Sequence, residues 1–154
     1  MGIVLGNDES VVKEDNFTTN LVLSWLKTNF SLTSKRVIGY QPNTLLGVFP
    51  LGKKEITYPL KNLASVSVST KFHFKRLIIG LILCLIGLGM FGDSFLGGLI
   101  LLILGALPLL NCYTSAMAIT NNAGQSHYIE MSILEKDKVQ SFVNDVNISV
   151  ADLA

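Results

Sequence analysis

The stretch that decides the fold is a long apolar run: residues 76–111 read RLIIGLILCLIGLGMFGDSFLGGLILLILGALPLLN, and its only internal charge is Asp93. As one straight helix, residues 77–110 would measure about 51 Å at ~1.5 Å per residue. The hydrocarbon core of a bilayer is only about 30 Å thick. A single membrane helix is therefore too long, and it would carry Asp93 into the lipid at a cost of roughly 2.5–3.5 kcal/mol.

A break in the middle of the run solves both problems. The tripeptide Gly92-Asp93-Ser94 is a turn signal, and Ser94 or Asp93 can cap a second helix. A buried soluble core is the other reading, but soluble domains rarely carry this many consecutive apolar residues. We therefore predict a two-helix transmembrane hairpin over residues 74–112.

The flanks of the run predict its orientation. Lys71, Lys75 and Arg76 precede the first helix, whereas no basic residue lies near the expected tip at residues 92–94. By the positive-inside rule, both ends of the hairpin are cytoplasmic and the tip faces outward. This predicts a multi-pass cell-membrane protein with both termini in the cytoplasm. The same three residues either contact anionic membrane lipid or only set the topology.

Small residues recur at helical spacing in both arms. Gly80, Cys84 and Gly87 follow an i, i+4, i+7 pattern, and Gly98 and Gly105 are seven residues apart. Small residues on one face let helix backbones approach closely in lipid. We expect the two arms to pack against each other through these five residues; packing between protomers is the alternative.

Composition narrows the function classes. The chain has 154 residues, of which 49% are hydrophobic and 15% charged, so we expect one small domain plus the hairpin. The net charge of +1 and the lack of a basic stripe with interleaved aromatics argue against nucleic-acid binding. No His, Cys, Asp or Glu residues have metal-ligand spacing, and no catalytic arrangement is apparent. We expect a protein that is not an enzyme, with no metal, cofactor or small-molecule substrate.

Residues 64–72 give the clearest strand signal before the hairpin. They alternate between two faces, with Val66, Val68 and Phe72 on the apolar side. The rest of this half predicts strands near residues 10–15, 21–33, 35–40, 44–49 and 53–58, with a turn at Gln41–Asn43 and a connection at Pro50–Gly52. Trp25 is most simply a core anchor, although exposure at the membrane face is the alternative.

After the hairpin, residues 113–120 and 126–133 are predicted strands, joined by a loop at residues 121–125. The period then changes, because Val139, Phe142, Val143 and Val146 form one apolar helix face. Ser132 and Glu135 resemble a capping box at the start of that helix. Two strands cannot form a stable domain alone. We therefore expect residues 1–73 and 113–154 to complete one cytoplasmic domain, with residues 74–112 inserted between neighbouring strands.

Three segments resemble the bacterial pleckstrin-homology-like (PH-like) family, some members of which carry membrane helices. They are SLTSKRVI at residues 31–38, ITYPLKNLASV at residues 56–66 and AITNNAG at residues 118–124, together with the final helix. The resemblance implies an α+β fold: a bent antiparallel sheet or barrel closed by a C-terminal helix. It also implies frequent oligomers and no catalytic residues. Other PH domains bind phosphoinositides through a basic loop; the candidate loops here are residues 42–44 and 50–54, of which only the second is charged.

Two functional hypotheses follow. In the first, the protein is a membrane-anchored scaffold or interaction module that binds protein partners or its own copies at the cytoplasmic membrane face. In the second, it is a small accessory subunit of a larger membrane complex for transport, secretion or immunity, and the hairpin is its docking element. The first predicts a defined homo-oligomer in detergent, whereas the second predicts a protein that needs its membrane-protein partner.

Overall fold

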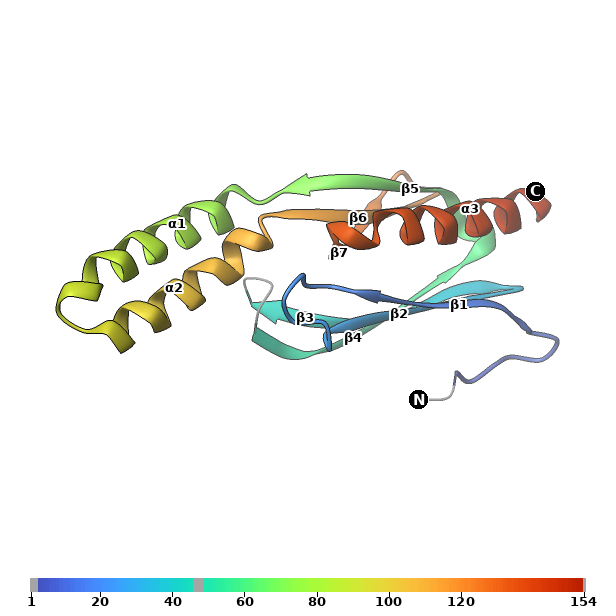
Figure 1. The fold of residues 1–154 in the computed structure, drawn as a ribbon. Coiled ribbons are helices and arrows are strands. Elements are labelled where there is room, and N and C mark those ends of the chain that lie inside the picture. The colour runs from blue at the N-terminus through green and yellow to red at the C-terminus, as the bar shows by residue number, and fades with distance from the viewer. Residues whose placement is uncertain (1–2, 46–48, 154) are drawn as a thin grey trace.

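The computed structural model describes residues 3–45 and 49–153. The fold is α+β, with antiparallel strands and a C-terminal helix, as expected from the sequence (Figure 1). The strands form two separate sheets instead of the single bent sheet or barrel that was expected. The four-stranded sheet has the order β1-β2-β3-β4 and the three-stranded sheet the order β5-β6-β7. The strands are β1 Val11–Thr18, β2 Lys27–Thr33, β3 Arg36–Leu45, β4 Phe49–Pro59, β5 Leu63–Phe72, β6 Tyr113–Asn121 and β7 Ser126–Ser132. The α-helices are α1 Phe74–Gly89, α2 Phe95–Leu110 and α3 Lys136–Asp152, and short 3-10 turns are η1 Leu60–Asn62, η2 Met90–Gly92 and η3 Ile133–Glu135.

The predicted turn at Gln41–Asn43 is wrong, because these residues continue β3 and pair with residues 52–54 of β4. Pro50–Gly52, expected to connect two strands, also lies inside β4. A proline is tolerated here because the pairing of β2 with β3 stops at Tyr40, so Pro42 has β4 as its only described neighbour in the sheet. The two candidate phosphoinositide loops are therefore strand segments. Part of the predicted strand at 44–49 lies outside the described residues.

The expected strand over residues 21–33 begins only at Lys27, and residues 19–26 form a loop. Trp25 in this loop is 70% exposed, so its assignment as a core anchor is wrong. Leu26 turns inward beside it instead. The aromatic centre of the core is built from Phe17, Phe30 and Phe142, whose ring centroids lie 5.8–6.1 Å apart.

The C-terminal helix α3 packs its predicted apolar face against both sheets. Val139, Phe142, Val143 and Val146 are all buried in one cluster with side chains from both sheets. The predicted capping box does not form, because the Glu135 carboxylate accepts hydrogen bonds from Thr18 N and Oγ1 instead, at 3.2 and 2.7 Å. Glu135 therefore ties η3 to the end of β1.

Strands β5 and β6, which flank the apolar run, are antiparallel neighbours from Leu63↔Asn121 to Phe72↔Tyr113. A register shift between Leu63 and Ser65 places Leu63 in the core and leaves Ala64 exposed, which departs from the strict alternation expected there. Beyond the last pair, His73 N donates to Cys112 O at 2.7 Å. Helices α1 and α2 thus leave the body side by side from one end of the β5–β6 ladder, as Figure 1 shows.

The chain reverses where the sequence predicted a break. Helix α1 ends at Gly89, η2 follows, and Ser94 caps α2 by accepting a hydrogen bond from Gly97 N at 3.3 Å. By length and apolar composition, helical residues 74–92 are suited to cross a membrane, whereas α2 is apolar but has only 16 residues.

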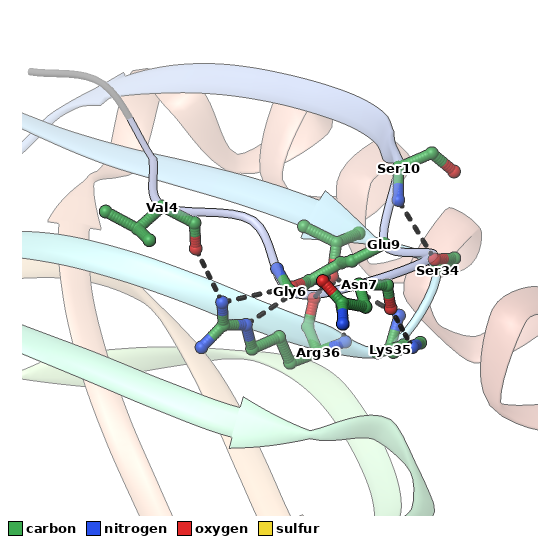
Figure 2. A network of polar contacts seen from close by, with 9 residues as sticks. Val4, Gly6, Asn7, Glu9, Ser10, Ser34, Lys35 and Arg36 are labelled. Atoms are coloured by element: carbon green, nitrogen blue, oxygen red, sulfur yellow. Dashed lines mark hydrogen bonds and ion pairs between the residues drawn. The ribbon is translucent and has the colours of Figure 1, made fainter.

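Polar contacts hold the N-terminal segment against the start of β3 in the four-stranded sheet (Figure 2). Arg36 Nε and Nη2 donate to the two carboxylate oxygens of Glu9 at 2.8 and 3.0 Å, and Nη2 also donates to Val4 O. Gly6 N donates to the same carboxylate. These contacts, with Arg36 foremost, lower the pKa of Glu9 to about 2.

Candidate functional site at the base of the hairpin

The five small residues predicted to mediate helix packing meet on one seam inside the chain. A Cβ added to Gly80 would lie 2.8 Å from Gly105 O and 2.5 Å from Leu109 Cγ, and one added to Gly105 would lie 2.7 Å from Cys84 Sγ. A Cβ on Gly87 would lie 2.9 Å from Gly98 O, and one on Gly98 would lie 2.6 Å from Gly87 O. The glycines therefore bring the backbones of α1 and α2 together within one protomer.

The outer surface of this hairpin is strongly apolar. In both helices the buried residues are glycines and Pro108, whereas none of the large apolar side chains is fully buried and most are exposed. Exposed examples are Ile78, Leu81, Ile82, Leu85, Ile86, Leu88, Phe95, Leu96, Ile100 and Ile103. This pattern is the reverse of a water-soluble helix pair, which buries its large apolar side chains.

At the base of the hairpin, Arg76 bridges α1 to the rest of the protein. Its Nη1 donates to Asn111 O and its Nη2 to Glu130 Oε2 on β7, both at 3.1 Å. Only 16% of its side chain is exposed. Arg76, predicted to lie at the membrane surface, is thus engaged by the protein itself.

The other two predicted surface residues have different environments. Lys71 Nζ lies 4.0 Å above the centre of the Tyr128 ring, a cation–π contact. Lys75 on the first turn of α1 is exposed. The structure therefore spreads the three basic residues over β5 and the start of α1.

A buried pair of asparagines locks the hairpin to the four-stranded sheet. Asn111, which ends α2, donates through Nδ2 to Asn20 Oδ1 at 3.0 Å, and its Oδ1 accepts from Leu21 N at 2.9 Å. Both side chains are almost fully buried, at 1% and 2% exposure. Because buried amides are costly to leave unpaired, this contact fixes the 19–26 loop against the hairpin.

His73 completes the polar cluster. Its Nε2 lies 3.2 Å from Glu130 Oε1 and 3.1 Å from Thr114 Oγ1. Burial lowers the pKa of His73; Glu130 opposes this effect, and the positive charges of Arg76 and Lys71 add to it. Burial therefore favours the neutral form of His73, and its ring lies within hydrogen-bonding distance of Thr114 on β6 and Glu130 on β7.

A polar cavity of about 260 Å³ opens beside this cluster. It is lined by Thr19, Gln41, Pro42, Asn43, Thr44, Arg76, Asn111, Tyr128 and Glu130. Arg76 is its cationic wall and Glu130 its anionic wall, and these two groups neutralise each other. Within the described part of the chain, no three His, Cys, Asp or Glu side chains gather as metal ligands. The base of the hairpin is thus a structural junction with a polar recess.

Sequence reasoning did not single out Asn20, Asn111 or Glu130 for this junction. Asn111 carried one signal, since it is the first polar residue after the apolar run and a natural place for α2 to end. Asn20 and Glu130 carried none, because their partners lie 91 and 54 residues away in the sequence.

No protein-family model, curated protein or solved structure matches this chain.

Proposed function

We propose that the protein is a membrane-anchored, non-enzymatic scaffold: a PH-like body held at the cytoplasmic membrane face by a transmembrane helical hairpin. The observation that carries the proposal is the inverted packing of α1 and α2, with glycines at their contact and large aliphatic side chains on the outside. In water such a surface is a strong association liability. In lipid it is the expected surface of a membrane hairpin, where small residues mediate helix contact.

The dimensions of the hairpin are compatible with a bilayer. Each 16-residue helix is about 24 Å long at ~1.5 Å per residue. The hydrocarbon core is about 30 Å thick, so η2 at the tip and the aromatic pair at the base complete the span. That pair, Phe72 and Tyr113, is exposed with ring centroids 6.1 Å apart, and tyrosine favours the membrane–water interface. Local bilayer thinning accommodates the remaining mismatch.

The PH-like assignment of the body is supported by its architecture. A four-stranded and a three-stranded antiparallel sheet share one core with a C-terminal helix. This arrangement agrees with the resemblance of residues 31–38, 56–66 and 118–124 to the bacterial PH-like family. Such a body supplies interaction surfaces, and we propose that it binds protein partners or further copies of itself.

Fractionation of native membranes tests the anchor. The full chain should stay in the membrane pellet after washing with alkaline carbonate, because its hairpin is embedded in lipid. Release into the supernatant would contradict the proposal.

Particle mass after gentle detergent extraction tests the scaffold. A single defined homo-oligomer is expected, because the outer faces of the hairpin and the body remain available for contacts between protomers. A monomer that becomes stable only when a membrane partner is co-extracted would favour an accessory subunit of a larger complex instead.

A further inference from the structure

The end of the four-stranded sheet beside the hairpin carries a second apolar surface. Its members are Val22 and Trp25 in the 19–26 loop and Leu45, Phe49 and Leu51 where β3 ends and β4 begins, here called the sheet-end surface. Their exposed fractions range from 41% for Val22 to 71% for Leu51. Five large apolar side chains exposed at one end of a small sheet call for an explanation.

Contacts place this surface beside the hairpin base. Leu21 N donates to Asn111 Oδ1, which holds the 19–26 loop against the end of α2. Residues 41–44 of β3 line the same cavity as Arg76 and Asn111, so the end of β3 lies next to these two residues. Figure 1 shows the β3 and β4 ends at the same side of the body as the start of α1 and the end of α2.

Basic residues accompany the apolar ones. Lys27, Lys53 and Lys54 are all exposed, and Lys53 lines a hollow together with Trp25, Lys27 and Pro42. Glu55 is the first acidic residue of β4. It follows Lys53 and Lys54 and lies further from the start of the strand at Phe49. Exposed aromatic and aliphatic tips next to lysines are the composition that suits an anionic lipid interface.

We propose that the sheet-end surface docks onto the lipid headgroup region, so that the body lies against the bilayer rather than hanging from the hairpin alone. The inference rests on the proposed membrane anchor, and it commits to lipid because the surface is continuous with the base of that anchor. The asparagine contact and the Arg76 bridge hold the body and hairpin in one orientation, so the surface needs no rearrangement to reach the membrane.

The chain provides its own probe, because Trp25 is its only tryptophan. The full-length protein is reconstituted into symmetric vesicles of phosphatidylcholine and phosphatidylglycerol, in which both insertion orientations meet the same lipids. The emission of Trp25 should shift to shorter wavelength relative to the denatured chain. It should also lose intensity when the phosphatidylcholine is brominated on acyl carbons close to the headgroup.

Variants separate the surface from the anchor. The double variant Phe49→Ser/Leu51→Ser should reduce bromolipid quenching of Trp25, whereas Val4→Ser/Leu153→Ser, which removes two exposed apolar side chains elsewhere, should not. Lys53→Glu should reduce quenching in anionic vesicles, because each basic residue near such a surface strengthens attraction by roughly fivefold. Lys61→Glu, in an exposed position at the opposite end of the sheet, is the matched control.

The outcomes distinguish the two proposals. Stable insertion into vesicles with Trp25 fully quenched by aqueous acrylamide and untouched by bromolipid would overturn the docking while leaving the anchor intact. A short-wavelength emission without bromolipid quenching would also overturn it, since a protein contact would then cover the surface. Failure of the chain to incorporate into vesicles at all would count against the anchor itself.

Discussion

Single residues hold this protein together where elements distant in sequence meet. Arg36 joins the N-terminal segment to β3, Arg76 joins α1 to β7, and Asn111 joins α2 to the 19–26 loop. Each uses several donors or acceptors at once. A single substitution at such a position therefore removes more than one hydrogen bond at a partly or fully buried site, which costs more than the loss of one exposed hydrogen bond.

The Asn111→Ala substitution should destabilise the protein by roughly 1–3 kcal/mol, because Leu21 N loses its acceptor and the buried amide contact with Asn20 is removed. Thermal unfolding in detergent measures the effect, and Trp25, which lies in the 19–26 loop itself, provides a local fluorescent reporter. Asn144→Ala removes an exposed asparagine from α3 and should change the midpoint little. Equal effects of the two substitutions would contradict the role of the buried amide pair.

The Glu9–Arg36 contact predicts a pH dependence in the acid range. The pKa of Glu9 falls from 4.5 to about 2 on folding, so its stabilising contribution is present above pH 4.5 and is lost as the pH falls towards 2. Glu9→Gln should therefore increase amide exchange at Gly6 and Ser10 at neutral pH, and the difference from wild type should vanish near pH 2. Asp137→Asn, a charge-matched change elsewhere, should not produce this pattern.

Among the elements, the hairpin helices and α3 differ in which side chains they bury. Helix α3 buries its large apolar side chains in the core, as helices do in water. The hairpin helices bury four of their glycines and leave most of their leucines and isoleucines exposed. Each pattern fits the solvent proposed for that element, because burial of apolar area drives packing in water but not in lipid.

The Gly87→Ala substitution should separate the two hairpin helices, because the added methyl group would lie 2.9 Å from Gly98 O and 3.0 Å from Leu102 N. Gly89→Ala, two residues further on in the same helix, meets nothing within 4 Å and is the matched control. Disulfide trapping between Cys84 and a cysteine placed at Leu102, whose carbonyl oxygen lies 3.9 Å from Cys84 Sγ, reports the separation in a background lacking Cys112. Gly87→Ala should reduce the yield of the disulfide. An unchanged yield would contradict the proposed role of the glycines in bringing α1 and α2 together.

Phe142 is the point where α3 closes the core. Phe142→Ala should destabilise the body by about 3–5 kcal/mol, since the ring is fully buried between Phe17 and Phe30. Ile148→Ala removes a side chain of the same helix that is 60% exposed and should cost far less. Denaturant unfolding in detergent compares them, and similar costs would contradict the assigned face of α3.

At the scale of the whole molecule, one end of the body carries everything proposed to meet the membrane. The base of the hairpin, with Lys75 in the first turn of α1, and the end of β3 lie at that end, while the C-terminus lies at the other end (Figure 1). The hairpin can lie at one end of the body because it is inserted between two neighbouring strands. These strands, β5 and β6, are hydrogen-bonded to each other along their length and connect the hairpin to the core.

The proposed topology predicts which positions are reached from outside an intact cell. A cysteine at Ser94, in a background without Cys84 and Cys112, should react with an impermeant maleimide in whole cells, since the hairpin tip faces outward. A cysteine at Asn144 on α3 should react only after lysis. The reverse pattern would invert the orientation drawn from Lys71, Lys75 and Arg76.

The sequence alone determined the features that depend on local pattern. The break at Ser94 follows from a turn tripeptide and a cap, the buried face of α3 from its helical period, and the glycine seam from small residues at helical spacing. These signals are short-range, so they can be read without knowing what the rest of the chain does.

The tertiary structure alone decided that residues 41–43 and 50–52 lie inside strands, that Trp25 lies outside the core, and that Asn20, Asn111 and Glu130 meet at the hairpin base. A strand can continue through Pro42 because the pairing of β3 with β2 stops at Tyr40, which no local pattern records. Likewise, a polar residue becomes a buried lock only when a partner some 90 residues away is folded against it. Local chemistry sets which elements form, whereas long-range packing sets which side chains those elements bring together.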